Sequence, residues 1–254
     1  MIANLQMYAW PEMSDAYDRY WGLVRDQLRQ ADVSAPDTLS CFEDESSPWL
    51  RDDLLLGQTC GFPYRHGLHD KVQLVGTPDY GVPGCSPGCY RSVFVTRRTD
   101  SAADPADFAD SRFVCNHRGS QSGYAAPLVF ASDNGFTFSQ CQESGSHRSS
   151  ARMVAEGAAD IACIDAVSWR LMERYDAFAS ELTVIAETTE NPGLPYITAL
   201  SNDRALLFDA VAGAIGELGP DDRQALGLCG IVYIPPEDYL AVRDPVDMNT
   251  RSDN

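Results

Sequence analysis

Residues 113–124 read Phe-Val-Cys-Asn-His-Arg-Gly-Ser-Gln-Ser-Gly-Tyr: an apolar run, a polar turn flanked by glycines, and a segment suited to a helix. This order predicts a strand, a loop and a helix start. Because the first turn of a helix has backbone N–H groups without intrahelical partners, such a start can hold an oxyanion. Ser120 and Ser122 add hydroxyl donors, and Gly119 and Gly123 let a ligand approach the backbone. A serine that only caps the helix is the alternative.

The composition narrows the classes of function. The chain has 254 residues, enough for one large domain or two small ones with a substantial core. Its 37 acidic and 19 basic residues give a net charge of -18, which repels nucleic acid and anionic membrane surfaces. We therefore expect no nucleic-acid partner. An anion site in this chain has to work through donors at close range, inside the screening length of about 8 to 10 Å.

The chain has no apolar run near the roughly 20 residues that span a bilayer, so we expect no membrane insertion. Residues 2–8 resemble a strand more than a signal peptide, which leaves two readings: an export signal removed from the sequence, or a cytoplasmic protein. The eight cysteines are scattered, and the spacing of Cys85 and Cys89 is weak for zinc, so we expect neither metal nor cofactor. We expect most of them to be buried free thiols, and Cys60 and Cys85, both in glycine-rich turns, are the candidate disulfide pair.

Apolar runs and amphipathic segments alternate along the chain, which predicts an α/β fold with parallel sheets. The expected strands are residues 2–8, 39–42, 54–56, 72–75, 90–97, 112–115, 161–164, 182–186 and 196–200, with another around Phe136 and Phe138. The expected helices are residues 14–31, 104–108, 148–157 and 203–218, with one more starting at Ser168.

Two segments rich in proline and glycine, residues 76–89 and 191–195, predict that the chain crosses twice between two lobes. Residues 1–89 and 190–254 are then the first lobe, and residues 90–189 form a second lobe inserted into it. Two crossover strands would join the lobes. This arrangement predicts a ligand cleft between the lobes and closure by hinge motion.

Four loops carry polar residues suited to one ligand, at Tyr90, Ser120–Ser122, His147 and Asp165. Together with residues 58–64, they resemble the phosphonate, phosphite and phosphate substrate-binding proteins of ABC transporters, which have the two-lobed type II periplasmic-binding-protein fold. The resemblance covers roughly residues 2–200. Its most specific pieces are residues 88–92, 119–124 and 145–147.

The resemblance implies a function and a site. The family's phosphonate loop reads Ser-Thr-Ser-Gly, so Ser120, Gln121, Ser122 and Gly123 fill it with one change. Tyr90 matches the crossover tyrosine that donates to the phosphonate, and His147 matches the histidine that starts the next helix. The resemblance implies a periplasmic, monomeric binding protein for a small phosphorus oxyanion, with an ABC permease as partner and no enzymatic activity. Trp49 and Tyr64 are further candidate ligand contacts in the first lobe.

Two positions depart from the aminophosphonate binders of this family, which carry acidic residues that pair with the ammonium group of the ligand. Leu194 and Val167 stand at the corresponding places. The departure argues against an ammonium-bearing ligand unless Asp165 supplies the charge. Gln121 replaces a hydroxyl by a larger amide, which reshapes the anion pocket.

Each candidate also has a plain structural reading: Tyr90 and Trp49 as packing residues, His147 as a solvated residue at a helix start, and Asp165 as a turn or cap residue. A sensor or binding protein of the same fold for a different small molecule is the alternative function. A hydrolase is a further rival, because serine, histidine and aspartate are all present. The acid follows the histidine, however, and Gln121 stands at the centre of the glycine motif, which disagrees with an α/β-hydrolase.

Overall fold

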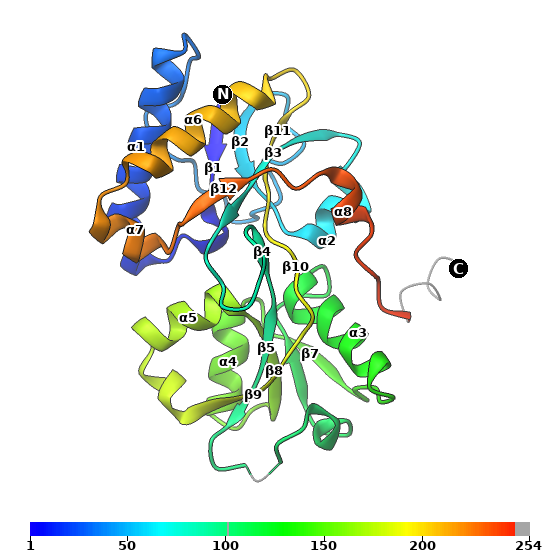
Figure 1. The fold of residues 1–254 in the computed structure, drawn as a ribbon. Coiled ribbons are helices and arrows are strands. Elements are labelled where there is room, and N and C mark those ends of the chain that lie inside the picture. Colours follow the sequence, from blue (N-terminus) through cyan, green and yellow to red (C-terminus); the bar gives the residue numbers. More distant parts are fainter. Residues whose placement is uncertain (101, 247–254) are drawn as a thin grey trace. The chain divides into compact units, whose positions relative to one another are not determined.

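The structure is a computed structural model that describes residues 1–100 and 102–246 (Figure 1). The described residues divide into two compact units: Met1–Cys89 with Pro192–Ala241, and Tyr90–Asn191 with the residues from Val242 on. The sequence predicted that residues 190–254 all belong to the first lobe. Residues 242–246 instead group with the second unit, where Arg243 donates to the Val129 carbonyl (3.4 Å) and pairs with Asp133. Residues 247–254 lie outside the described residues.

The first unit has a sheet with strand order β1-β2-β11-β3-β12. Its strands are β1 (Ile2–Asn4), β2 (Leu54–Gln58), β3 (Val72–Asp79), β11 (Tyr196–Ala199) and β12 (Gly230–Val232). Its helices are α1 (Ser14–Gln30), α2 (Gly61–Pro63), α6 (Arg204–Glu217), α7 (Pro220–Leu226) and α8 (Pro236–Leu240), and short helical turns cover Gln6–Tyr8, Pro11–Met13 and Tyr64–Leu68.

Helices α1 and α6 pack against each other, as their apolar spacing requires (Figure 1). Tyr20, Trp21 and Leu28 lie on the buried face of α1. Asp203 caps α6 by accepting from the backbone N–H groups of Ala205 (2.9 Å) and Leu206 (3.2 Å). The predicted helices at 14–31 and 203–218 are therefore confirmed to within a residue at each end.

The second unit, green and yellow-green in Figure 1, has a sheet with strand order β7-β6-β8-β5-β9. Its strands are β5 (Ser92–Arg97), β6 (Phe113–Cys115), β7 (Cys141–Glu143), β8 (Ile161–Asp165) and β9 (Leu182–Glu187). Its helices are α3 (Ala126–Asp133), α4 (His147–Ala155) and α5 (Ala166–Tyr175), with helical turns at Pro105–Phe108, η5 (Gln121–Ala125) and Ala177–Glu181. At the crossings, β4 (Cys89–Tyr90) pairs with β10 (Asn191–Pro192).

The sheets are mixed, so the prediction of parallel sheets is wrong. Strands β1 and β2 run parallel, as do β6, β7 and β8, but β11 is antiparallel to both of its neighbours and β5 is antiparallel to β8 and β9. The strands next to the crossings explain the difference. Because the chain enters β5 and β11 directly from the crossings, these two strands need no helical crossover of the kind that makes neighbouring strands parallel.

Residues 39–42, all of them described, form no strand, contrary to the prediction. The Gln6 side chain donates to the Phe42 carbonyl (3.0 Å) and accepts from the Phe42 N–H (3.0 Å), while the Ser40 N–H bonds to Ala3 (2.7 Å). These bonds satisfy the backbone without a ladder. The expected strand at residues 2–8 likewise ends at Asn4 and continues as a helical turn.

Aromatic side chains form the core under the sheet of the second unit. The Phe113 and Phe138 rings stack at 4.4 Å between centroids, and Phe130 lies 4.9 Å from Phe94. The strand predicted around Phe136 and Phe138 instead lies at Cys141–Glu143, because both phenylalanines pack their rings as part of a loop. This packing fixes β6, the strand that leads into residues 116–124.

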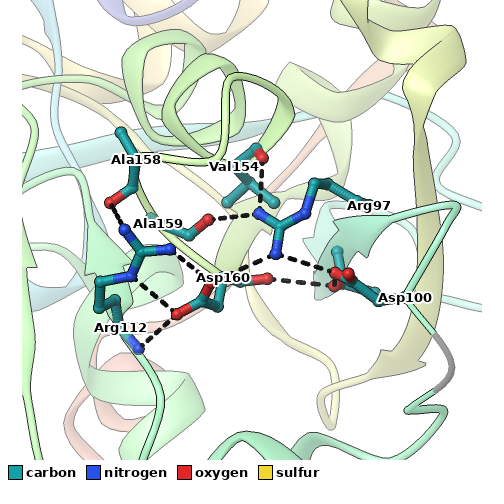
Figure 2. Close-up of polar contacts among 8 residues, drawn as sticks. Arg97, Asp100, Arg112, Val154, Ala158, Ala159 and Asp160 are labelled. Atoms are coloured by element: carbon teal, nitrogen blue, oxygen red, sulfur yellow. Dashed lines mark hydrogen bonds and ion pairs between the residues drawn. The ribbon is translucent and has the colours of Figure 1, made fainter.

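Asp160 joins the ends of three strands of the second unit (Figure 2). Its carboxylate accepts from the Arg112 guanidinium (2.7 and 2.9 Å), from the Arg112 backbone N–H (3.0 Å) and from Arg97 (3.2 Å). Arg97 also donates to the carbonyls of Val154 (3.0 Å) and Ala159 (2.7 Å). Because Arg97 ends β5 while Arg112 and Asp160 precede β6 and β8, the network ties these strands together.

Within the residues that the structure describes, no helix is long and apolar enough to cross a membrane. Cys60 and Cys85 are not joined by a disulfide in the described structure, so the predicted pair is wrong. Cys60 lies buried at the start of α2, whereas Cys85 closes its own turn by an N–H bond to Val82 (3.1 Å). Glycine-rich surroundings alone do not bring two sulfurs within bonding distance.

Candidate anion site

Strand β6 leads into the candidate site, which begins where this strand ends. Phe113, Val114 and Cys115 are completely buried, and β6 lies between β7 and β8. Ser120 then caps η5, because its Oγ accepts from the Gly123 N–H at 3.1 Å. Turn η5 continues directly into α3. The predicted order of strand, loop and helix start is confirmed.

Two serines and a histidine meet at this helix start. The Ser120 and Ser122 Oγ atoms lie 3.3 Å apart, and the Ser122 Oγ lies 2.8 Å from the His147 Nε2. His147 is the first residue of α4, which Ser146 caps by accepting from the Ser149 N–H (3.1 Å). The structure thus brings together three predicted site residues from two separate loops. We call Ser120, Ser122 and His147 the hydroxyl–imidazole chain.

Backbone bonds hold the two loops in place. The Ser144 N–H donates to the Cys115 carbonyl (2.9 Å), and the Gly145 N–H donates to the Asn116 carbonyl (2.8 Å). These bonds extend the β6–β7 ladder into the loops. His147 follows shortly after them, so its ring is positioned by the same strand pairing that positions Ser120 and Ser122.

Burial holds His147 in the neutral form. It lowers the pKa of His147 to about 3, and the nearby His117 lowers this pKa further. Among the described residues, the buried His147 Nδ1 atom has no hydrogen-bond partner. The tautomer with a proton on Nδ1 would bury an unpaired donor, so the favoured tautomer carries its proton on Nε2. In this tautomer His147 donates to Ser122, whose hydroxyl hydrogen is then available to a ligand.

Asn116 also lies at this helix start, although the sequence did not single it out. Its side chain is 8% exposed, and its Oδ1 atom has no hydrogen-bond partner within the described part of the chain. A Cβ atom on Gly123 would lie 2.1 Å from this Oδ1 and 3.1 Å from the His147 Cε1. Only glycine at position 123 lets Asn116 and His147 pack at the helix start. The available signal was a polar residue directly after a buried strand.

The other second-unit candidates occupy buried positions around these elements. The Asp165 Oδ1 accepts from the N–H groups of Val167 (2.7 Å) and Ser168 (2.9 Å), so Asp165 caps α5. Gln121 is buried in η5, and Tyr90 is buried in β4. Contacts of Asp165, Gln121 and Tyr90 with a ligand stay predictions.

Trp49 and Tyr64 lie in the core of the first unit. The Trp49 indole N–H donates to the Gln58 carbonyl (3.0 Å), and the Tyr64 ring meets the Tyr239 ring edge-on at 5.3 Å. Burial raises the pKa of Tyr64 to about 12. Trp49 and Tyr64 therefore pack in the core of the first unit. Contact of either side chain with a ligand stays a prediction.

Residues 56–238 match the sequence model of the periplasmic substrate-binding protein of phosphonate ABC transporters. No curated protein matches the chain in sequence.

Solved structures share the fold. PhnD1 from Prochlorococcus marinus, in complex with methylphosphonate, has a TM-score of 0.71 at 16% identity, covering 94% of this chain and 93% of that one. A Xanthomonas citri protein bound to ATP has a TM-score of 0.69 at 14% identity, covering 94% and 92%. A phosphonate-transporter binding protein from Pseudomonas aeruginosa has a TM-score of 0.67 at 16% identity, covering 94% and 83%. The fold is that of the type II periplasmic binding proteins, as predicted.

Proposed function

This chain belongs to the family of periplasmic substrate-binding proteins of phosphonate ABC transporters, and on that premise we propose that it holds a phosphorus oxyanion at Ser120, Ser122 and His147. The observation that carries the proposal is the hydroxyl–imidazole chain at the start of η5, with Ser122 Oγ 2.8 Å from His147 Nε2. In the periplasm, the protein would carry the bound oxyanion to an ABC permease.

The donors of this site suit an oxyanion. His147 stays neutral at pH 7 and directs its Nε2 proton to Ser122, which leaves the Ser122 hydroxyl to donate outward. A donated hydrogen bond to a charged acceptor contributes about 1.5 to 3 kcal/mol. The helix start adds backbone donors and the positive end of its dipole. These close-range donors work against the repulsive field of a chain with net charge -18.

The serine–histidine pair resembles half of a catalytic triad, but its geometry favours binding. In a triad, a carboxylate accepts from the second nitrogen of the imidazole and stabilises the imidazolium. Within the described residues, His147 Nδ1 has no hydrogen-bond partner, and burial keeps the ring from taking a proton. We therefore propose that Ser122 is a ligand donor and that the protein does not transform its ligand.

The expected ligand carries no ammonium group. Leu194 and Val167, at the positions where the resemblance places acidic residues, are both buried apolar side chains. Asp165 already uses an oxygen to cap α5. Burying an ammonium beside apolar groups without a carboxylate is unfavourable by several kcal/mol. The proposed ligands are therefore phosphite, methylphosphonate and phosphate.

A ligand panel tests this class. Thermal-shift measurements with excess phosphite, methylphosphonate, phosphate and 2-aminoethylphosphonate should show stabilisation by at least one of the first three, because a ligand that binds only the folded state raises the melting temperature. We expect 2-aminoethylphosphonate to give the smallest shift. A larger shift with 2-aminoethylphosphonate than with methylphosphonate would contradict the assignment of Leu194 and Val167.

Gln121 favours a second candidate function, the binding of a different small molecule by the same fold. It places a buried amide where the resemblance has threonine. ATP belongs in the panel for this reason, since the Xanthomonas citri relative was solved with ATP. Stabilisation by ATP, and by none of the phosphorus oxyanions, would favour this second function.

Replacing Ser122 by alanine tests the site itself. The change removes the hydroxyl that His147 orients, so we expect anion affinity to fall by about 1 to 3 kcal/mol, roughly 5- to 150-fold. Isothermal titration calorimetry with the best ligand of the panel measures the loss. Ser132→Ala on α3 is a matched control, because Ser132 lies outside the hydroxyl–imidazole chain. Unchanged affinity in Ser122→Ala would remove Ser122 from the site.

A further inference from the structure

Two cysteine side chains of the second unit lie against each other. Cys115 ends β6 and Cys141 begins β7, and the parallel register pairs Phe113 with Cys141 and Cys115 with Glu143. Because alternate residues of a strand point to the same face, Cys115 and Cys141 share one face as diagonal neighbours. Their Sγ atoms lie 3.1 Å apart, about 1 Å more than a disulfide bond of about 2.05 Å. Both are thiols in this structure.

The two thiols differ in accessibility and in charge. Cys115 is completely buried, whereas Cys141 is half-buried on β7, which is the edge strand of the sheet. Arg118 donates to the Cys141 carbonyl at 3.2 Å, which brings a guanidinium close to the Cys141 sulfur. The Cys115 thiol and this guanidinium both lower the pKa of Cys141. Cys141 is therefore the thiol that can meet an oxidant as a thiolate.

We propose that Cys115 and Cys141 form a disulfide that cross-links β6 to β7 in the oxidising periplasm, where this family acts. The oxidant is a disulfide compound, such as oxidised glutathione. The Cys141 thiolate attacks one glutathione sulfur and releases the first glutathione thiolate. Cys115 then loses its proton, attacks the Cys141 sulfur and releases the second. Two protein thiols lose two electrons and two protons, and one glutathione disulfide becomes two glutathione thiols.

The cross-link would stabilise the two strands, β6 and β7, that lead into the loops of the anion site. Strand β6 continues into the loop that ends at Ser120, and β7 continues through residues 144–146 into His147. The disulfide would join the last residue of β6 to the first residue of β7. It would lie next to the backbone hydrogen bonds from Ser144 to Cys115 and from Gly145 to Asn116, which hold the two loops together. It would also fasten an edge strand whose Gln142 and Glu143 side chains are exposed.

Peptide mapping of the full chain tests the proposal. The protein is equilibrated with oxidised and reduced glutathione at several ratios, remaining thiols are alkylated, and proteolytic peptides are analysed by mass spectrometry. We expect one intramolecular cross-link between Cys115 and Cys141, present in the Cys41→Ser control and absent in Cys141→Ser. The oxidised protein should melt about 5 °C above the reduced protein, because the cross-link restricts the unfolded chain.

Cys141→Ser provides the decisive comparison, because Cys141 is half-buried and its replacement keeps the buried Cys115 in place. Its melting temperature should be the same in oxidising and reducing buffer. Three results would overturn the proposal: Cys115 and Cys141 alkylated after full oxidation, either of them linked to another cysteine, or equal melting temperatures for the oxidised and reduced wild type. None of these readouts depends on the ligand, so the proposed anion site is tested separately.

Discussion

Replacing Gly123 by alanine is expected to weaken binding of methylphosphonate or phosphite by more than about 100-fold, or about 3 kcal/mol. The new Cβ would lie 2.1 Å from the Asn116 Oδ1 and 3.1 Å from the His147 Cε1, so both side chains have to move. Moving His147 breaks the bond that orients the Ser122 hydroxyl, and moving Asn116 takes its buried side chain away from the helix start. The loss should therefore exceed that of removing the Ser122 hydroxyl alone. Titration calorimetry measures it.

Gly216→Ala on α6, outside the candidate site, is the matched control. A Cβ at Gly216 would meet nothing within 4 Å, and its backbone needs no left-handed conformation. We expect this variant to bind nearly as well as the wild type. The folded state of both variants is checked by circular dichroism. Full affinity in a folded Gly123→Ala protein would mean that the packing of Asn116 and His147 is irrelevant to the anion.

Replacing Asp160 by asparagine is expected to lower the free energy of unfolding of the second unit by about 3 kcal/mol at pH 7. The Asp160 side chain is only 20% exposed and accepts four hydrogen bonds, three of them from Arg112. Asparagine cannot accept the paired bonds of a guanidinium, so Arg112 and Arg97 lose their shared partner (Figure 2). Urea unfolding, followed by hydrogen exchange of peptides from β6 and β8, measures the loss.

The loss should depend on pH in a definite direction. The hydrogen bond from the Arg112 side chain is the main reason that the pKa of Asp160 lies well below its usual range. The unfolded chain therefore takes up a proton at a higher pH than the folded chain. The stabilisation is complete above the unfolded pKa of about 4 and is lost as the pH falls toward the folded value.

The difference between wild type and Asp160→Asn should accordingly shrink as the pH is lowered from about 5 to 2. Glu173→Gln, an exposed carboxylate on α5, is the control and should change stability by less than about 0.5 kcal/mol at every pH. A gap between wild type and Asp160→Asn that stays constant over this range would show that the carboxylate charge does not stabilise the unit.

Local patterns were enough to predict the helices and the course of the site loop. The spacing of Tyr20, Trp21 and Leu28 matches a helix that buries one face, and α1 does so. The sequence 113–124 predicted a buried strand, a capped turn and a helix, because each of these features depends on neighbouring residues. Ser120 and Ser122 were singled out because hydroxyl donors suit a helix start that binds an anion, and His147 was singled out by the family resemblance.

Pairing between distant segments could not be predicted in the same way. The antiparallel placement of β11 between β2 and β3 depends on where the chain returns from the second unit, which no local pattern records. Residues 39–42 have an apolar strand-like composition, but the side chain of Gln6, far away in sequence, bonds to the backbone of Phe42. Asn116 was missed because its importance depends on the absent side chain of Gly123.

The cysteines also show that contacts between distant segments could not be predicted from local patterns. Composition suggested Cys60 and Cys85, whereas the sulfurs that meet, Cys115 and Cys141, are 26 residues apart and come together only through the β6–β7 register. Asp165 is a further case. Its position at a strand end fits both a cap and a ligand contact, and the structure shows the cap through its bonds to Val167 and Ser168.

A crystal structure of the protein with methylphosphonate, or with the best ligand of the panel, tests the central claim most directly. We predict phosphonate oxygens within about 2.5 to 3.0 Å of the Ser122 Oγ, beside Ser120, with His147 Nε2 still donating to Ser122. Ligand density elsewhere in the protein, with the Ser122 hydroxyl bonded to His147 alone, would contradict the claim that the hydroxyl–imidazole chain holds the oxyanion.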